Sequence, residues 1–580
     1  MTPGIARRPS LLSSPVWLLV PAVLLLAVFF VWPVMQLLVL SVQDANAALS
    51  GANFQRIFSQ SLYVRVLLVT LRIAAITTLL SVVLGYPLAY WLSGLPKRTR
   101  GYMMLLVVVP FWTSYLVKAF AWMLILGRTG VLNRILAGID VGPLPLLQSE
   151  GAVIVGMLHG MLPLAVLTML PVISKIDLRL LQAGETLGAS PIRAFWLIHA
   201  PLALPGLASA GLLTFITSLG FFIIPALLGS PQQTFLAQII ITQIQQLLSF
   251  GFASALSVLL LAATLVAWIA YNKVFGISTL SGQQTSQPTG NSWMRTIGVA
   301  SAKGSAAIFE RVAQTSARIL PASVVRFIMP TYGLIILFFL AAPSLVVIPA
   351  SLTSASFLGF PPQGISLRWF ATYFNSPLWI AATINSFIIG FTTAACATVI
   401  GGLAALALAK VRSRWNAAIF ALLLSPMVVP RIVFGVGLMY LFARLGLIGT
   451  KTGLIIGHTV LALPFTFVTI AAMLQGYDWR LDQAAATLGA SAPRVLTRIT
   501  IPLIKDGLTA AFLFAFITSF DELTLALFVS GGLVTTLPKQ MWDDMFLQLS
   551  PTIAAASVVV FTIVIVLLLV ADRATNKNSR

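Results

Sequence analysis

Cysteine and charge are what this sequence has least of. One cysteine, Cys396, occurs in 580 residues, and it lies inside an apolar run. A single thiol can form neither an internal disulfide nor a clustered thiolate metal site, which excludes redox chemistry based on paired cysteines. Charged residues make up 8% of the chain and hydrophobic residues 59%. A soluble chain cannot carry that balance, so we expect an all-α integral membrane protein.

Acidic residues are scarcer than basic ones, with 14 Asp and Glu against 35 Lys and Arg. The basic residues lie in short clusters between apolar runs and not on one soluble face, so no nucleic-acid partner is expected. No Gly-x-x-x-x-Gly-Lys-Ser/Thr phosphate loop occurs, so the chain is not expected to hydrolyse ATP itself. His159, His199 and His458 lack the spacing of metal ligands. We therefore expect no cofactor, no metal and no catalytic site.

Twelve apolar runs are long enough to cross about 30 Å of hydrocarbon. They fall at 16–42, 63–93, 102–126, 151–173, 203–228, 252–272, 327–351, 380–409, 416–443, 452–474, 504–529 and 552–571. The first run is too long for the core of a signal peptide, so we expect it to be retained as a helix. The polar segment 276–326 is expected to be a flexible linker with a short amphipathic piece.

Basic clusters predict the orientation in the membrane. They follow the second, fourth and eighth runs at Lys97, Arg98 and Arg100, at Lys175, Arg179 and Arg193, and at Lys410, Arg412 and Arg414. Because positive residues are enriched in cytoplasmic loops, these loops should face the cytoplasm. The same alternation places both termini and the linker on the cytoplasmic side of a multi-pass protein.

The chain contains an internal repeat. At an offset of 301 residues, the segment Gln182-Ala-Gly-Glu-Thr-Leu-Gly-Ala-Ser190 lies over Gln483-Ala-Ala-Ala-Thr-Leu-Gly-Ala-Ser491. Nearer the start of each half the offset becomes 316, which matches Pro110 with Pro426. The chain is thus expected to consist of two homologous six-helix halves, 1–275 and 327–580, joined by the linker. Because both halves would have the same topology, as in parallel-repeat transporters, a solute path between them is expected.

The repeated segment lies in a predicted cytoplasmic loop but has the composition of a short surface helix. Its small residues, Ala183 to Gly188 and Ala484 to Gly489, would leave a shallow surface on which another protein can dock closely. Pro201 and Pro502 can open the helices that follow, where a missing amide costs little.

These residues resemble the motif of bacterial ABC importer permeases: Glu-Ala-Ala, three residues, Gly, about nine residues, then Ile-x-Leu-Pro. Its letters here are Gln182, Ala183, Gly184, Gly188 and Ile198 to Pro201, and again Gln483, Ala484, Ala485, Gly489 and Ile499 to Pro502, with Gln in place of the first acid in both copies. The resemblance implies that both segments are coupling helices. It also implies two ATP-binding cassette ATPase subunits, a periplasmic solute-binding protein, a small-molecule solute and the bacterial inner membrane, with alternating access driven by ATP.

More narrowly, both halves resemble the spermidine/putrescine permease subfamily. The resemblance rests on segments such as Phe250-Gly-Phe-Ala-Ser254, Ser519-Phe-Asp-Glu522 and Thr535-Thr-Leu-Pro538. It implies a polyamine-type solute. Related branches carry ferric iron, thiamine or aminoethylphosphonate, and these solutes stay open.

Four ionisable residues fall inside predicted spans, where charges are costly and usually face the protein interior or an aqueous path. They are Lys118, Arg431, Asp521 and Glu522. One interpretation is an ion pair in which the acids of the eleventh span neutralise Arg431 of the ninth, and the other is direct contact with solute. Polyamine permeases usually carry an acid where Arg431 stands, and this departure favours a zwitterionic or anionic solute.

Two other classes of function are weighed against the importer. An ion-coupled secondary transporter could also arise by duplication, and it would work without an ATPase. A channel or receptor without energy coupling would not need two docking loops at the same cytoplasmic depth.

Overall fold

The computed structural model describes residues 15–44, 46, 48–275, 322–357, 359–411, 413–548 and 550–576. Most of the linker expected at 276–326 therefore lies outside the described residues, which include only its last five. The described part is helical, apart from an isolated bridge between Gln43 and Leu49.

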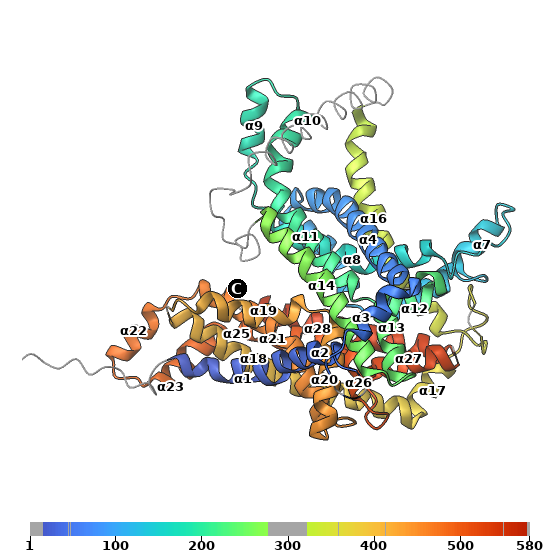
Figure 1. Ribbon diagram of the computed structural model, residues 1–580. Helices are drawn as coiled ribbons and strands as arrows, with labels where there is room; N and C mark the ends of the chain where they lie inside the picture. Colours follow the sequence, from blue (N-terminus) through green and yellow to red (C-terminus); the bar gives the residue numbers. More distant parts are fainter. Residues whose placement is uncertain are drawn as a thin grey trace, which may run out of the picture. The chain divides into compact units, whose positions relative to one another are not determined.

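The helices before the linker have the following bounds: α1 (Val20–Leu26), α2 (Trp32–Ser41), α3 (Ala52–Ser59), α4 (Ser61–Ser93), α5 (Lys97–Trp112), α6 (Tyr115–Leu126), α7 (Val131–Ala137), α8 (Glu150–Ile173), α9 (Arg179–Thr186), α10 (Pro191–Ala194), α11 (Ala200–Leu219), α12 (Ile223–Leu228), α13 (Leu236–Gln245) and α14 (Phe250–Phe275). Those after it are α16 (Ala322–Ser351), α17 (Arg368–Asn375), α18 (Pro377–Lys410), α19 (Asn416–Val428), α20 (Arg431–Leu445), α21 (Lys451–Gln475), α22 (Arg480–Thr487), α23 (Ala492–Val495), α24 (Ile501–Leu503), α25 (Lys505–Phe520), α26 (Thr524–Val529), α27 (Leu537–Leu547) and α28 (Thr552–Asn576). Figure 1 labels most of these helices.

The same order of helices occurs on both sides of the linker, and equivalent bonds hold equivalent helices. The Thr70 hydroxyl of α4 accepts a hydrogen bond from the backbone N–H of Leu236 at 3.0 Å. The Ser386 hydroxyl of α18 accepts one from Leu537 at 2.7 Å. Thr70 and Ser386 are 316 residues apart, and Leu236 and Leu537 are 301 apart. Both offsets of the sequence repeat therefore hold in three dimensions.

Among the described residues, nine helices are long and apolar enough to cross a membrane, and two bent pairs raise the number to eleven. The twelfth predicted span corresponds to a shorter apolar helix, Thr552–Leu567. The protein is thus an all-helical, multi-pass membrane protein, and the predicted count of twelve uninterrupted spans is not confirmed.

Three predicted spans are broken, each for a local reason. The predicted span 416–443 bends by 98° between α19 and α20. There Pro430 forces the preceding residue, Val429, into an extended conformation, with a ψ of 126°. The predicted span 102–126 breaks at Thr113 and Ser114, and the Ser114 hydroxyl caps α6 by accepting a hydrogen bond from the N–H of Leu116. The predicted span 504–529 is divided, because α25 ends at Phe520 and the polar pair Asp521 and Glu522 separates it from α26.

The chain forms two compact units that cut across the sequence halves. One consists of Met1–Arg56, Ile240–Val258 and Leu367–Arg580, and the other of Ile57–Ile239 and Leu259–Ser366. The division into halves at 1–275 and 327–580 describes homology and stays a prediction, whereas the units describe packing.

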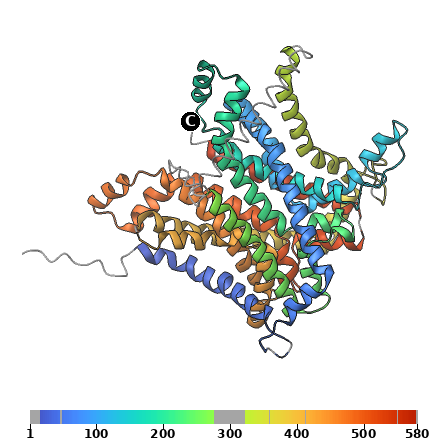
Figure 2. The same ribbon diagram turned by 45° about the horizontal axis from the view of Figure 1, so that its top comes forward.

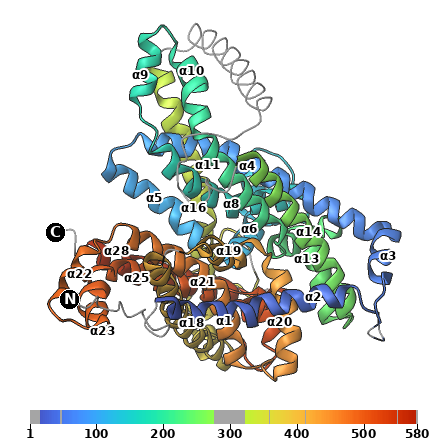
Figure 3. The same cartoon turned by 60° about the vertical axis from the view of Figure 1, so that its left-hand side comes forward.

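In the first unit, the N-terminal helices pack on helices of the second half. α2 lies against α20, and α1 runs beside α18, as Figure 1 and Figure 3 show. In the π-helical turn between α1 and α2, the ring of Phe30 lies 5.7 Å from that of Phe434 in α20.

In the second unit, α16 takes the corresponding place. It packs against α4, α5 and α6, and the Tyr332 hydroxyl donates a hydrogen bond to the carbonyl of Leu84 at 2.7 Å. Figure 2 shows the long helix α4, in blue, running along the green helices that follow it in sequence. Each half thus lends its first helix to the unit built mainly from the other half.

Candidate functional site

The two repeated segments fold into the same local structure. α9 and α22 are short helices that end at a glycine with positive φ: +91° at Gly188 and +82° at Gly489. In both copies the chain then closes a helix-ending turn, with the N–H of Ala189 bonded to the carbonyl of Gly184 and that of Ala490 to Ala485, each at 3.0 Å. Glycine is suited to this position because other residues are strained at such a φ.

Each turn leads into the next membrane helix by the same route. α10 and α23 follow the turns, and each continues into one π-helical turn, Phe195–His199 and Leu496–Thr500. Pro201 and Pro502 then lie in the first turn of α11 and α24, as expected from the sequence. Figure 3 shows α9 beside α10 and α22 beside α23.

α9 and α22 present the same residue types at several equivalent exposed positions. Gln182, Ala183 and their equivalents Gln483 and Ala484 are exposed, whereas Gly184 and Ala485 are half-buried.

The most exposed large hydrophobic residues of these segments are leucines at equivalent positions. Leu187 is 89% exposed and Leu488 is 88% exposed. Apart from the residues directly adjoining each glycine, no atom lies within 4 Å of a Cβ built on Gly188 or Gly489, so the surface beside each leucine is open. Burying a leucine side chain is worth about 1.5–3 kcal/mol. Both segments thus present an apolar contact that a partner could cover.

α22 is held by a polar network centred on Asp482. Its carboxylate accepts hydrogen bonds from the Lys410 ammonium at 3.1 Å, from the Thr500 hydroxyl at 3.3 Å and from the Tyr477 hydroxyl. Burial and the bond to Asp482 raise the pKa of Tyr477 above its usual value of 10.0. Sequence reasoning missed this network. The signal was an acid inside the repeated segment at a position where the first copy has Leu181.

α9 is held differently. A Cβ added to Gly184 would lie 2.6 Å from the Cδ1 of Ile198, so the glycine allows close packing on the π-helical turn. The ring of His199 in that turn stacks on Phe195 at 5.3 Å and bonds to the Tyr86 hydroxyl at 2.9 Å. The two equivalent surfaces therefore rest on an aromatic cluster in one copy and on a charged network in the other.

An ion pair joins the start of α20 to the loop after α25. The Arg431 guanidinium lies 2.9 Å from the Glu522 carboxylate. The Arg431 side chain is 47% exposed, whereas that of Glu522 is 1% exposed. Glu522 also accepts a hydrogen bond at 3.2 Å from the N–H of Leu525, in the first turn of α26. The buried carboxylate is thereby satisfied on both oxygens.

The first repeat has an aromatic pair at the equivalent positions. Tyr115 lies 316 residues before Arg431, and Phe221 lies 301 residues before Glu522. Their rings meet edge to face, with centroids 4.7 Å apart. An ion pair and an aromatic pair thus join the same two elements in the two repeats.

The other ionisable residues predicted inside spans occupy separate positions. Asp521 ends α25, and its N–H bonds to the carbonyl of Ile517. Lys118 is 2% exposed and lies in the other unit, where its ammonium sits over the Tyr115 ring at 4.3 Å. The structure therefore brings Arg431 together with Glu522, while Lys118 contacts the aromatic pair of the first repeat.

A buried histidine and a serine share a hydrogen bond close to the ion pair. Nδ1 of His458 is 2.7 Å from the Ser519 hydroxyl, and both residues are buried. In the described part of the chain, no group of three or more His, Cys, Asp or Glu side chains could hold a metal ion.

Comparison with known proteins finds one matching region in each repeat. Residues 81–274 and 397–577 match the family described as binding-protein-dependent transport system inner membrane component. The chain is 30% identical over 253 residues to the spermidine/putrescine transport system permease protein PotC of Haemophilus influenzae, which covers 44% of this chain and 98% of that protein. It is 34% identical over 210 residues to PotB of Escherichia coli, which covers 36% of this chain and 76% of that protein. A solved structure, a bacterial alginate ABC transporter in complex with an alginate pentasaccharide-bound periplasmic protein, matches with a TM-score of 0.39 and 18% identity over 44% of this chain and 92% of that one.

Proposed function

The chain belongs to the family of binding-protein-dependent transport system inner membrane components, and from that premise we propose that α9 and α22 are the helices through which two ATPase subunits drive its transport cycle. As an ABC importer permease the protein is not itself an enzyme, and ATP hydrolysis belongs to a separate subunit. The proposal extends this to alternating access, in which ATP binding and hydrolysis move the two helices and so switch the solute path between its two sides.

The observation that carries the proposal is the pair of exposed leucines. Leu187 and Leu488 occur at equivalent positions, each beside an open glycine turn, and each is almost fully exposed. Apolar side chains presented in this way at two matching sites suit a partner that binds twice. Two copies of one ATPase, or two related ATPases, meet that requirement.

The docking role is tested by Leu187→Asp and Leu488→Asp, made separately in the chain co-expressed with its ATPase. Each charge would have to be desolvated in the contact, so each variant should lower retention of the ATPase on the purified permease at least tenfold. Leu533→Asp is the matched control, because Leu533 is 83% exposed but lies outside both segments. Retention as strong in both variants as in the control would reject the proposal.

The solute that best fits the similarity is a polyamine. The relatives named above are spermidine/putrescine permeases, 30% and 34% identical over 98% and 76% of their own length and over 44% and 36% of this chain. Aminoethylphosphonate is the second candidate, because Arg431 presents a guanidinium that is 47% exposed and could meet an anionic group. Ferric iron and thiamine remain as further solutes of the same class.

Uptake into proteoliposomes separates these candidates. Permease, ATPase and binding protein are reconstituted together, and labelled spermidine, putrescine, aminoethylphosphonate, ferric iron and thiamine are compared with and without ATP. ATP-dependent accumulation of a polyamine supports the proposal. Accumulation driven by a proton or sodium gradient, by the permease alone, would show a secondary transporter instead.

A further inference from the structure

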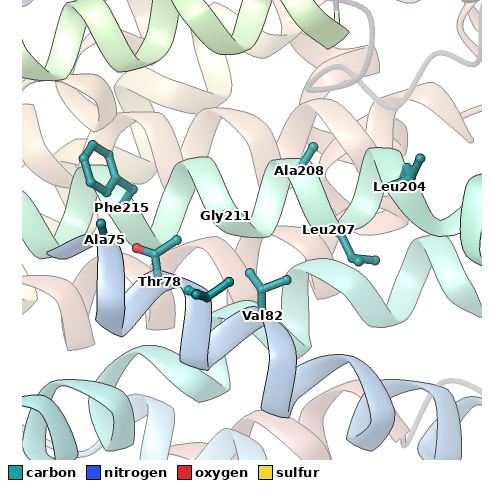
Figure 4. Close-up of a pocket in the computed structure, with 9 residues that line it drawn as sticks. Ala75, Thr78, Val82, Leu204, Leu207, Ala208, Gly211 and Phe215 are labelled. Carbon is teal, nitrogen blue, oxygen red and sulfur yellow. The ribbon is translucent and has the colours of Figure 1, made fainter. Parts of the chain in front are cut away.

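An open groove of about 420 Å³ runs between α4 and α11. Figure 4 shows its lining, in which Thr78 is the one polar side chain among nine residues. The volume falls within the range of about 300–1,000 Å³ typical of sites for small molecules. The lining therefore offers a charged solute one hydroxyl and no charged group.

The second repeat places aromatic rings at the equivalent positions. Ala75 and Gly211, which line the groove, correspond to Phe391 and Phe512 at the offsets of 316 and 301 residues. The rings of Phe391 and Phe512 lie 6.1 Å apart across the seam between α18 and α25.

Further rings complete the packing of that seam. Phe391 lies 4.7 Å from the ring of Phe516, which corresponds to Phe215 of the groove. Phe387, which corresponds to Leu71, lies 5.3 Å from Phe520. One seam therefore carries phenyl groups at two positions where the other has a methyl group and a hydrogen atom.

The surroundings of the groove favour hydrocarbon as the occupant. α4 and α11 both belong to candidate membrane spans, Ser61–Ser93 and Pro191–Leu219. The rim is apolar and open, with Leu79 64% exposed and Leu204 48% exposed. Thr217, the exposed polar residue of α11, lies two residues beyond Phe215 and so points away from the groove face. An apolar face of a membrane span that lacks charged groups suits contact with lipid chains, because the bilayer interior offers no water.

We propose that this groove is a binding site for one acyl chain of a phospholipid. The chain takes the space that Phe391 and Phe512 occupy in the second repeat and seals the seam between α4 and α11. The site belongs to the first repeat alone. It makes the two otherwise equivalent seams different in composition, one sealed by protein and one by lipid.

The test exchanges the residues of the two seams. Ala75→Phe with Gly211→Phe fills the groove, and Phe391→Ala with Phe512→Gly opens a new one. Each variant is extracted with mild detergent from cells, and the phospholipids that stay bound are counted by native mass spectrometry. The wild type should retain one phospholipid that the filled variant loses, and the opened variant should retain one more than the wild type.

A second measurement covers the case in which a variant does not fold. The wild-type chain is reconstituted in vesicles of phosphatidylethanolamine and phosphatidylglycerol that contain a phosphatidylcholine with a diazirine near the end of one acyl chain. Cross-links should concentrate on Thr78 and Ala208, on the floor of the groove, above the level at other lipid-facing spans. Equal phospholipid counts in wild type and filled variant, or no enrichment of cross-links at these two residues, would overturn the proposal.

Discussion

The guanidinium of Arg431 lies 2.9 Å from the buried carboxylate of Glu522, at the positions that Tyr115 and Phe221 hold in the first repeat. The same two elements are therefore joined by an ion pair in one repeat and by an aromatic pair in the other. If the ion pair has a structural role, an aromatic pair should support the fold in the second repeat as well.

Arg431→Tyr alone should destabilise the protein by about 3 kcal/mol, because it leaves Glu522 buried and unpaired. Arg431→Tyr with Glu522→Phe should recover most of that loss, since it installs the pair found in the first repeat. The measurement is thermal unfolding of the purified protein in detergent. Arg431→Tyr with Asp521→Gly is the control, because Gly220 is the first-repeat equivalent of Asp521, and it should not recover stability. A double variant that is stable but transports nothing would instead assign the pair to solute contact.

Asp482→Leu should loosen α22 without unfolding the protein. The variant removes the acceptor for Lys410, Tyr477 and Thr500, and bonds of this kind contribute about 1–3 kcal/mol. Hydrogen exchange followed by mass spectrometry should show faster exchange across Arg480–Thr487 and no change in α9. Asp478→Asn is the control, because the Asp478 carboxylate accepts a hydrogen bond from the backbone N–H of Arg480, and an amide oxygen can replace it there. Unchanged exchange in α22 would show that the network does not hold it.

Asp544→Asn should stabilise the protein at neutral pH. Burial, with a further contribution from neighbouring Asp543, raises the pKa of Asp544 above its usual value of 3.8. A raised pKa means that the folded state binds the proton more tightly, so this group favours folding below about pH 3.8 and the benefit is lost as the pH rises through the folded pKa.

The difference in melting temperature between Asp544→Asn and the wild type should therefore be positive at pH 7 and shrink toward pH 4. Asp543→Asn is the matched control. It breaks the ion pair in which the Lys539 ammonium lies 2.6 Å from the Asp543 carboxylate, so it should not stabilise the protein. A gain of the same size from both variants would point to net charge and not to burial.

Gly437→Ala should destabilise the contact between α2 and α20. A Cβ at Gly437 would lie 2.8 Å from the backbone oxygen of Pro33, and backbone cannot move aside cheaply. Gly101→Ala is the control, since a Cβ there meets nothing within 4 Å inside α5. Replacing a helical glycine by alanine is worth up to about 1 kcal/mol, so the control should raise the melting temperature while Gly437→Ala lowers it. Equal gains in both would contradict the close approach of the two helices.

Sequence alone predicted the class of the protein and the repeat, because hydropathy and self-similarity are local properties. The positions of Gly188, Gly489, Pro201 and Pro502 in their turns follow from the backbone conformations that glycine and proline permit.

What sequence missed depended on tertiary contacts. The partner of Arg431 was narrowed to two adjacent acids, and only the geometry of the loop after α25 selects Glu522. Hydropathy did not predict the bend at Pro430, because the residues on both sides of it are equally apolar. The exchange of helices between the units could not be predicted either, since the sequence of an apolar helix does not indicate the surface on which it packs.

That exchange limits the order in which the protein can be completed. α2 is synthesised early, but the helix on which it packs, α20, is made only after the whole first repeat and the segment that follows it. The N-terminal helices must therefore stay in the bilayer without their final neighbour until α20 has been made. The contact between them joins residues very far apart in the sequence. α16 has no such delay, because its neighbours already exist when it emerges. A cut between the repeats would leave each fragment with a helix inside the other fragment's unit, so the two pieces would be held together by packing where the covalent connection had been lost.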